Sequence, residues 1–239
     1  MIHNTICPYC SCVLVVAENL ANSRSVEHLI PNTVLTRKRG KDEGDFNACR
    51  SCNSRKSKID YVLSVVAKMQ SRHSTVAVES LVAAVSKTDG RISAAQKMLR
   101  SVNETIDGGA TMEMPISGAD LLDYMIFLGK GQYFKRHRTI FNAHLNVLLC
   151  RWYNKQVTAS FESNYLAEHR SNNFRDLEKN SHTEVIAEGE CMIYAKNHKY
   201  MFAFHDYIVI AVEVKKRNKK NIERAARLNA EILDGFPTR

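Results

Sequence analysis

CPYC at residues 7–10 and CRSC at residues 49–52 are the two stretches that decide the fold of the N-terminal part. In each stretch two residues separate the cysteines, a spacing typical of a tight turn in which both sulfur atoms converge on one side. Two such turns supply four thiolates, the tetrahedral set that Zn²⁺ prefers. The pattern therefore predicts a structural zinc site formed by Cys7, Cys10, Cys49 and Cys52, which stabilises a module too small to rely on a large core.

The remaining cysteines do not indicate a disulfide framework. The chain has seven cysteines, an odd number, and no export signal follows Met1, so we expect a reducing, cytoplasmic setting. Cys12 lies beside the first pair, and the sequence leaves its role open. It either imitates a ligand of the zinc site or is simply a buried thiol. The alternative for the whole set is that the motif cysteines are ordinary core residues.

The composition indicates a soluble protein with a basic surface. The chain has 239 residues, 44% of them hydrophobic, and a net charge of +9. No run approaches the roughly 18 apolar residues that a membrane span needs, so we expect no membrane association. A basic protein favours nucleic acid as a partner, although many soluble proteins are mildly basic without binding it.

A second set of residues surrounds the second cysteine pair. Glu27-His28 is followed by Leu-Ile-Pro, Asn47 precedes CRSC, and Asn53 follows it. A lone Glu-His pair is more often a surface pair or a hydrogen-bonded histidine than an active site. The position of Glu27-His28 between the two cysteine pairs favours an active site over those alternatives.

Taken together, these motifs resemble the HNH (ββα-metal) endonucleases, in particular the branch that carries cysteine pairs. The resemblance covers about residues 7–60 and implies a β-hairpin and a helix around one divalent ion, Mg²⁺ or Mn²⁺. It implies that His28 is the general base, that Glu27 and Asn53 bind the catalytic ion, and that Asn47 orients the catalytic loop. The implied activity is metal-dependent hydrolysis of phosphodiester bonds, in DNA sooner than in RNA.

The sequence departs from the family pattern in two places. Asn47 stands closer to Cys49 than in many members, and the last metal-binding position is Asn53 instead of histidine. Either change is compatible with a zinc module that binds nucleic acid or a protein and cuts nothing. An enzyme that cleaves RNA with the same residues is the other alternative.

Cations around the presumed site are candidates for phosphate contacts. They lie in the loop before the second cysteine pair and in the first turns of the helix after it: Arg37, Lys38, Arg39, Arg50, Arg55 and Lys56. Such residues could meet the nucleic-acid backbone on either side of a cut. The alternative is a solvated, charged face.

The rest of the chain predicts an α+β protein with a helical middle and C-terminal antiparallel strands closed by a helix. We divide it into residues 1–60, 61–103 and 104–239, the last with an unknown role in partner binding or regulation. The expected helices cover residues 59–101, 118 to about 129, 136–155 and 222–233, and the expected strands cover 185–186, 191–195, 200–204 and 207–214. Gly129 and Gly131 are expected to end the second helix, and His144 to lie on an apolar helix face.

Residues 215–220 read KKRNKK and could touch nucleic acid, touch an acidic partner, or form a solvated turn. Small HNH proteins with an unfamiliar appended part also resemble nuclease effectors of bacterial anti-phage and restriction systems. That resemblance implies a protein partner, often an ATPase.

Overall fold

The structure is a computed structural model of the 239-residue chain. It describes residues 1–69, 115–153, 181–187, 190–205 and 208–235, with isolated residues between 70 and 114. The elements are β1 (Arg24–Glu27), the 3-10 turn η1 (Lys41–Glu43), β2 (Phe46–Cys49), α1 (Arg50–Met69), β3 (Asn103–Glu104), β4 (Ala110–Thr111), α4 (Gly118–His137), β5 (Asn146–Tyr153), β6 (Ser181–Ala187), β7 (Cys191–Lys196), β8 (Lys199–Phe204), β9 (Ile208–Lys216) and α7 (Lys219–Gly235). The chain is therefore a mixed α+β protein with antiparallel sheets, as the sequence predicts.

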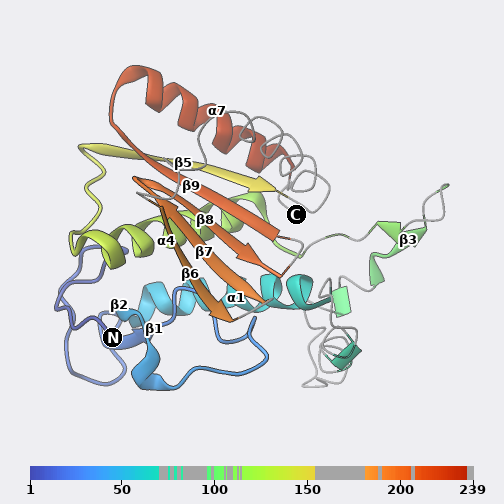
Figure 1. Ribbon diagram of the computed structural model, residues 1–239, viewed down its shortest axis with the longest axis horizontal. Helices are drawn as coiled ribbons and strands as arrows, with labels where there is room; N and C mark the ends of the chain where they lie inside the picture. Colours follow the sequence, from blue (N-terminus) through green and yellow to red (C-terminus); the bar gives the residue numbers. More distant parts are fainter. Residues whose placement is uncertain are drawn as a thin grey trace.

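The C-terminal strands form a five-stranded antiparallel sheet in the order β5-β9-β8-β7-β6. Along β9, Ile208, Ile210, Val212 and Val214 alternate with less buried residues, so one face of this inner strand is apolar. Helix α4 covers that face, and α7 packs along β5 and α4 (Figure 1). The strands predicted over residues 185–214 and the final helix are confirmed.

Helix α4 passes straight through both glycines that were expected to end it. Ser117 caps its start by accepting a hydrogen bond from the Asp120 amide, and the helix runs on to His137. A Cβ at Gly129 would lie 2.6 Å from Val212 Cγ1, and one at Gly131 would lie 2.5 Å from Leu29 Cδ1. The glycines thus allow α4 to approach the sheet and the N-terminal part closely, and the stop prediction was wrong.

The helix predicted over residues 136–155 is also wrong. After α4 ends, residues 146–153 form β5, which pairs with β9 from Asn146↔Lys216 to Tyr153↔Val209. The short apolar run at 147–150 suits a strand as well as a helix, and pairing with β9 decides between them. His144 consequently lies exposed in the loop before β5 instead of on an apolar helix face.

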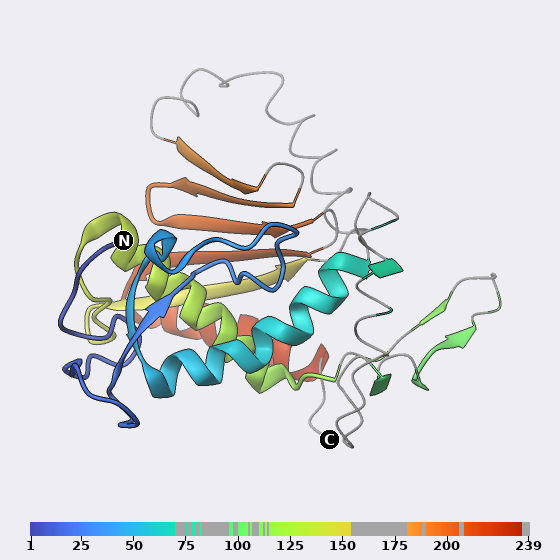
Figure 2. The ribbon, with the colours of Figure 1, turned by 90° about the horizontal axis from the view of Figure 1, so that it is seen from below.

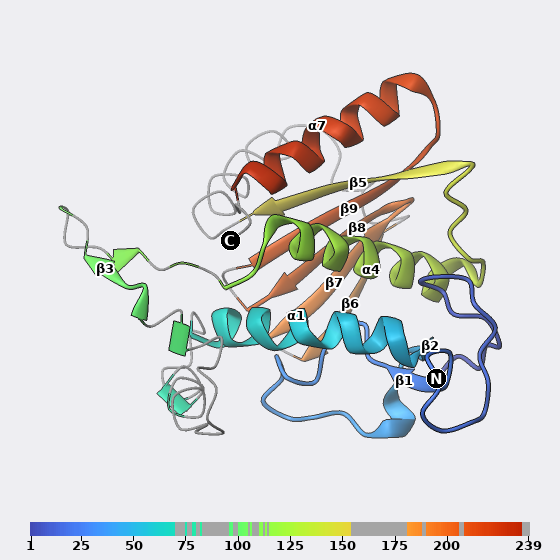
Figure 3. The same cartoon turned by 180° about the vertical axis from the view of Figure 1, so that it is seen from behind.

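The N-terminal part follows the order β1, β2, α1. The two strands pair antiparallel, with Arg24 opposite Cys49 and Glu27 opposite Phe46. Helix α1 begins directly after β2 and runs beside α4 (Figure 3). The predicted helix over 59–69 is part of α1, whereas most of the predicted helical stretch beyond residue 69 lies outside the described residues.

One buried apolar cluster contains residues from all of these parts. It includes Leu29 and Ile30 after β1, Leu63 of α1, Met125 of α4 and Ile210 of β9. Lys135 of α4 adds polar links, since its ammonium lies 2.7 Å from Asp45 Oδ1 and 2.6 Å from Glu184 Oε1. Viewed from below, α1 and α4 cross each other on the same side of the sheet (Figure 2). Among the described helices, none is both long and apolar enough to cross a membrane.

Candidate functional site: the cysteine cluster and His28

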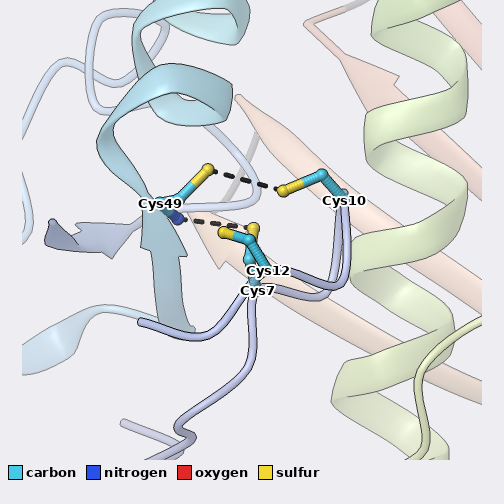
Figure 4. Close-up of side chains that lie close together, drawn as sticks. All are labelled: Cys7, Cys10, Cys12 and Cys49. Carbon is cyan, nitrogen blue, oxygen red and sulfur yellow. Dashed lines mark hydrogen bonds between the residues drawn. The ribbon is translucent and has the colours of Figure 1, made fainter. Parts of the chain in front are cut away.

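The N-terminal cysteines gather around one point. The sulfur atoms of Cys7, Cys10, Cys12 and Cys49 all lie within 4.8 Å of one another (Figure 4). Cys10 Sγ and Cys49 Sγ are 3.7 Å apart. With Zn–S bonds of about 2.3 Å, the sulfurs of a tetrahedral site lie about 3.8 Å apart. The cluster fits a metal ion such as zinc, which would tie the first loop to the β2–α1 junction.

Local backbone geometry brings these thiols together. The Cys7 amide donates to the Cys12 carbonyl (2.8 Å), and the Ser11 amide donates to the Cys7 carbonyl (2.9 Å). Ser11 has a φ of 64°, so the chain turns sharply and returns Cys12 to Cys7. Cys49 ends β2, and its amide donates to Cys7 Sγ in the first loop (3.3 Å).

Cys52, a predicted zinc ligand, stands next to this set of four. Its amide donates to Cys49 Sγ (3.4 Å), and its thiol hydrogen-bonds Cys7, which lowers the pKa of Cys7 to about 4 against the effect of burial. Cys12, which the sequence left without a role, belongs to the set, and burial raises its pKa to about 12. Five thiols thus surround a point where a tetrahedral ion needs four. The only sequence signal for Cys12 was its closeness to Cys10.

His28 follows β1 and is half-buried. Its Nε2 lies 3.1 Å from the Gly40 carbonyl oxygen. A carbonyl can only accept, so Nε2 carries the proton and Nδ1 is the unprotonated nitrogen of the neutral ring. The pKa of His28 lies below 6.5, because burial disfavours the charged ring more than the hydrogen bond to Gly40 favours it. The residue is therefore a neutral, oriented imidazole at neutral pH.

Glu27 points into the protein instead of toward solvent. Its carboxylate is 1% exposed and lies 3.0 Å from the Lys56 ammonium. Lys56 also contacts both oxygens of Asp60 (3.0 Å each) and the His28 carbonyl (3.3 Å). Burial raises the pKa of Glu27 to about 7, although Lys56 opposes that rise. Lys56 is itself 1% exposed, so its predicted role as a surface contact for phosphate is wrong.

The two asparagines join the hairpin to its surroundings. Asn53 Nδ2 donates to Ser25 Oγ (2.6 Å) and to the Val26 carbonyl (3.1 Å), which ties the first turn of α1 to β1. Asn47 is buried in β2, where its backbone exchanges hydrogen bonds of 2.8 and 2.9 Å with the Asn4 side chain. These hydrogen bonds hold α1 against β1 and hold β2 against the N-terminal segment.

The residues expected to hold a catalytic divalent ion do not fit that group in this arrangement. The Glu27 carboxylate already has a cation against it, and the Asn53 amide nitrogen is held by β1, which leaves Asn53 Oδ1 as the single oxygen ligand of the expected pair. Among the residues that the structure describes, the cysteine set is the one group of three or more His, Cys, Asp or Glu side chains close enough to hold a metal ion.

Of the other predicted phosphate contacts, three are exposed and two form ion pairs with aspartates. Arg37, Lys38 and Arg50 are exposed. Arg39 is 15% exposed and lies 3.6 Å from Asp45, so it mainly secures the loop. Arg55 is exposed but pairs with Asp123.

A cavity of about 340 Å³ lies between α1 and α4, lined by Arg55, Lys58, Asp120, Asp123 and neighbouring apolar residues. His28 does not line it, so this cavity is not part of the candidate site.

Comparisons with models of protein families, with curated proteins and with solved structures find no match for this chain.

Proposed function

We propose that the chain is a zinc-stapled nuclease of the HNH type, which hydrolyses phosphodiester bonds in DNA with His28 as the general base. The observation that carries the proposal is the state of His28: a half-buried ring, held through Nε2 by the Gly40 carbonyl, with a lowered pKa. A base that removes a proton from water must be neutral at working pH and must present an unprotonated nitrogen. Nδ1 of His28 meets both requirements.

The surroundings of His28 support the same chemistry. The histidine lies just beyond β1, which pairs with β2, the strand that ends at Cys49 of the cysteine cluster. Zinc in that cluster would supply a rigid link and no reacting group, because a closed thiolate site leaves no position for substrate. The exposed side chains of Arg37, Lys38 and Arg50 are available to neutralise phosphates on either side of the cut.

A divalent ion, Mg²⁺ or Mn²⁺, remains part of the proposal through the family resemblance alone. Because Glu27 is paired with Lys56, its carboxylate is not available to bind that ion in the described arrangement. The same pairing favours a second candidate function: a zinc module that binds nucleic acid or a protein without cutting. The role of effector in an anti-phage or restriction system, with a partner such as an ATPase bound by the C-terminal part, is likewise proposed from resemblance.

Plasmid cleavage tests the proposal. Zinc-loaded protein is incubated with supercoiled plasmid and Mg²⁺ or Mn²⁺, and His28→Ala is compared with His182→Ala, a control at an exposed histidine of β6. We expect nicking by the wild type and by His182→Ala, and a loss of at least 100-fold in His28→Ala, within the range for removal of a general base.

Equal zinc content in the three proteins excludes a folding defect as the cause of that loss. Equal cleavage by His28→Ala would refute the role of His28. No cleavage by any of them, on plasmid or on RNA, would favour the binding module.

A further inference from the structure

Three segments that are distant in sequence meet at one end of the C-terminal sheet. They are the last turn of α4, the loop into β5, and the turn from β9 to α7, which lie on the same side of the molecule in Figures 1 and 3. Asn146 pairs with Lys216 at the ends of β5 and β9. The Arg217 amide donates to the Leu145 carbonyl (2.7 Å), and its guanidinium donates to the Ala143 carbonyl (2.9 Å).

These segments expose cations with almost no acidic residues among them. We call the set the basic edge: Arg136, Arg138, Lys216, Arg217, Lys219 and Lys220, all exposed. Neither residues 136–150 nor residues 214–222 contain an aspartate or glutamate. The nearest acid along β9, Glu213, already lies 2.8 Å from Lys215 and 3.7 Å from Lys199. Within the described part of the chain, no ion pair neutralises a member of the basic edge.

This charge arrangement works against local stability. Lys219 and Lys220 occupy the first turn of α7, where the helix dipole favours acidic residues, and that turn contains none. Its cap is the neutral Asn218, whose Oδ1 accepts the Asn221 amide at 2.9 Å. Crowded cations that break a local preference without an internal partner indicate a surface used for an anionic ligand.

Helix α4 links the basic edge to the cysteine cluster within the fold. Two residues before Arg136, Phe134 packs in the same buried cluster as Cys7 and Phe46. Further back, the Lys130 ammonium donates to the Tyr9 carbonyl (2.8 Å), beside the first cysteine pair. Nucleic acid, a polyanion with regularly repeated charge, is a ligand that can contact both regions.

We infer that the basic edge binds the phosphate backbone of nucleic acid that extends beyond the candidate site. This inference rests on the proposed function for its choice of polyanion. Contacts of this kind position a substrate and carry no sequence information, and they make binding strongly dependent on salt.

Binding of a fluorescent DNA duplex, followed by anisotropy between 0.05 and about 0.3 M salt, tests the inference. The full-length chain carries His28→Ala, so that cleavage does not interfere. In this background the triple variant Lys216→Gln, Lys219→Gln, Lys220→Gln is compared with Lys97→Gln, Arg100→Gln, Arg227→Gln. The second triple removes the same charge from exposed cations elsewhere.

Each lost phosphate contact lowers the slope of log K against log salt by about 0.9. The edge variant should therefore lose about 2.7 in slope, which corresponds to an affinity loss on the order of 100-fold near 0.15 M salt. The control should keep the slope and the affinity.

Equal slopes in the edge variant and the parent protein, or equal losses in both triples, would overturn the inference. So would absence of DNA binding together with binding of polyglutamate, which would assign the edge to an acidic protein. The readout is independent of cleavage. Edge-dependent DNA binding by a protein that never cuts would therefore overturn the proposed function alone.

Discussion

Replacing Lys56 by methionine should strongly destabilise the N-terminal part. The ammonium lies 3.0 Å from Glu27 Oε1 and 3.0 Å from each oxygen of Asp60, and all three side chains are buried. Methionine keeps most of the volume but removes the charge that compensates both carboxylates. Removing one partner of a buried ion pair costs about 3–5 kcal/mol. We expect the free energy of unfolding to fall by that amount at pH 8.

The loss should depend on pH in a defined direction. In the wild type the pKa of Glu27 is raised from 4.5 to about 7, so the folded state holds this proton more tightly than the unfolded state. The stability contributed by that proton is complete below pH 4.5 and is lost as the pH rises through about 7. Without Lys56, which lowers this pKa, the loss continues to higher pH. Lys56→Met should therefore resemble the wild type most closely at pH 5.5 and least at pH 8.

Urea unfolding followed by circular dichroism at these two pH values, with zinc present throughout, measures the effect. Lys58→Met, at an exposed lysine of the same helix, is the matched control and should unfold like the wild type. If Lys56→Met and Lys58→Met unfold at the same urea concentration at pH 8, Lys56 does not compensate buried acids, and the inward orientation of Glu27 is wrong.

Four further outcomes are expected. Gly131→Ala should destabilise the fold by about 1–3 kcal/mol in thermal unfolding, since its Cβ would lie 2.5 Å from Leu29 Cδ1; an unchanged melting temperature would contradict the close approach of α4. The double change Cys10→Ser, Cys49→Ser leaves three of the five thiols and should lower bound zinc, measured by atomic emission; full retention of zinc would place the site elsewhere. The acidic limb of the cleavage rate should have its midpoint below pH 6.5, the ordinary value for His28; a midpoint above it would exclude this base. Glu27→Gln should lower stability while leaving the Mg²⁺ dependence of the remaining cleavage unchanged; a shifted Mg²⁺ dependence would make Glu27 a metal ligand.

Features that depend on neighbours in the sequence were predictable. Alternating apolar residues identify β7, β8 and β9, because strand periodicity is a local property. The local sequence likewise offered Ser117 or Asp120 as the helix cap, and the structure uses Ser117. The closeness of the cysteines could also be foreseen, since two short pairs with zinc-ligand spacing point to one site.

Features that depend on packing were not predictable. Gly129 and Gly131 have the composition of a helix stop, and they became contact points only because β9 and Leu29 press against α4. Residues 146–153 became a strand because β9 offered a free edge.

The sequence by itself determined the α+β class, the cysteine pairs and the identity of the Glu27-His28 motif. Only the tertiary structure decided how these groups face: Cys12 enters the sulfur set, His28 is oriented by Gly40, and Glu27 turns inward to Lys56. The physical reason is that residue type and spacing restrict which groups can meet, whereas burial and charge compensation are set by segments far away in the chain. From its residue type alone Lys56 was expected on the surface. Its ion pairs with the buried carboxylates of Glu27 and Asp60 place it in the core.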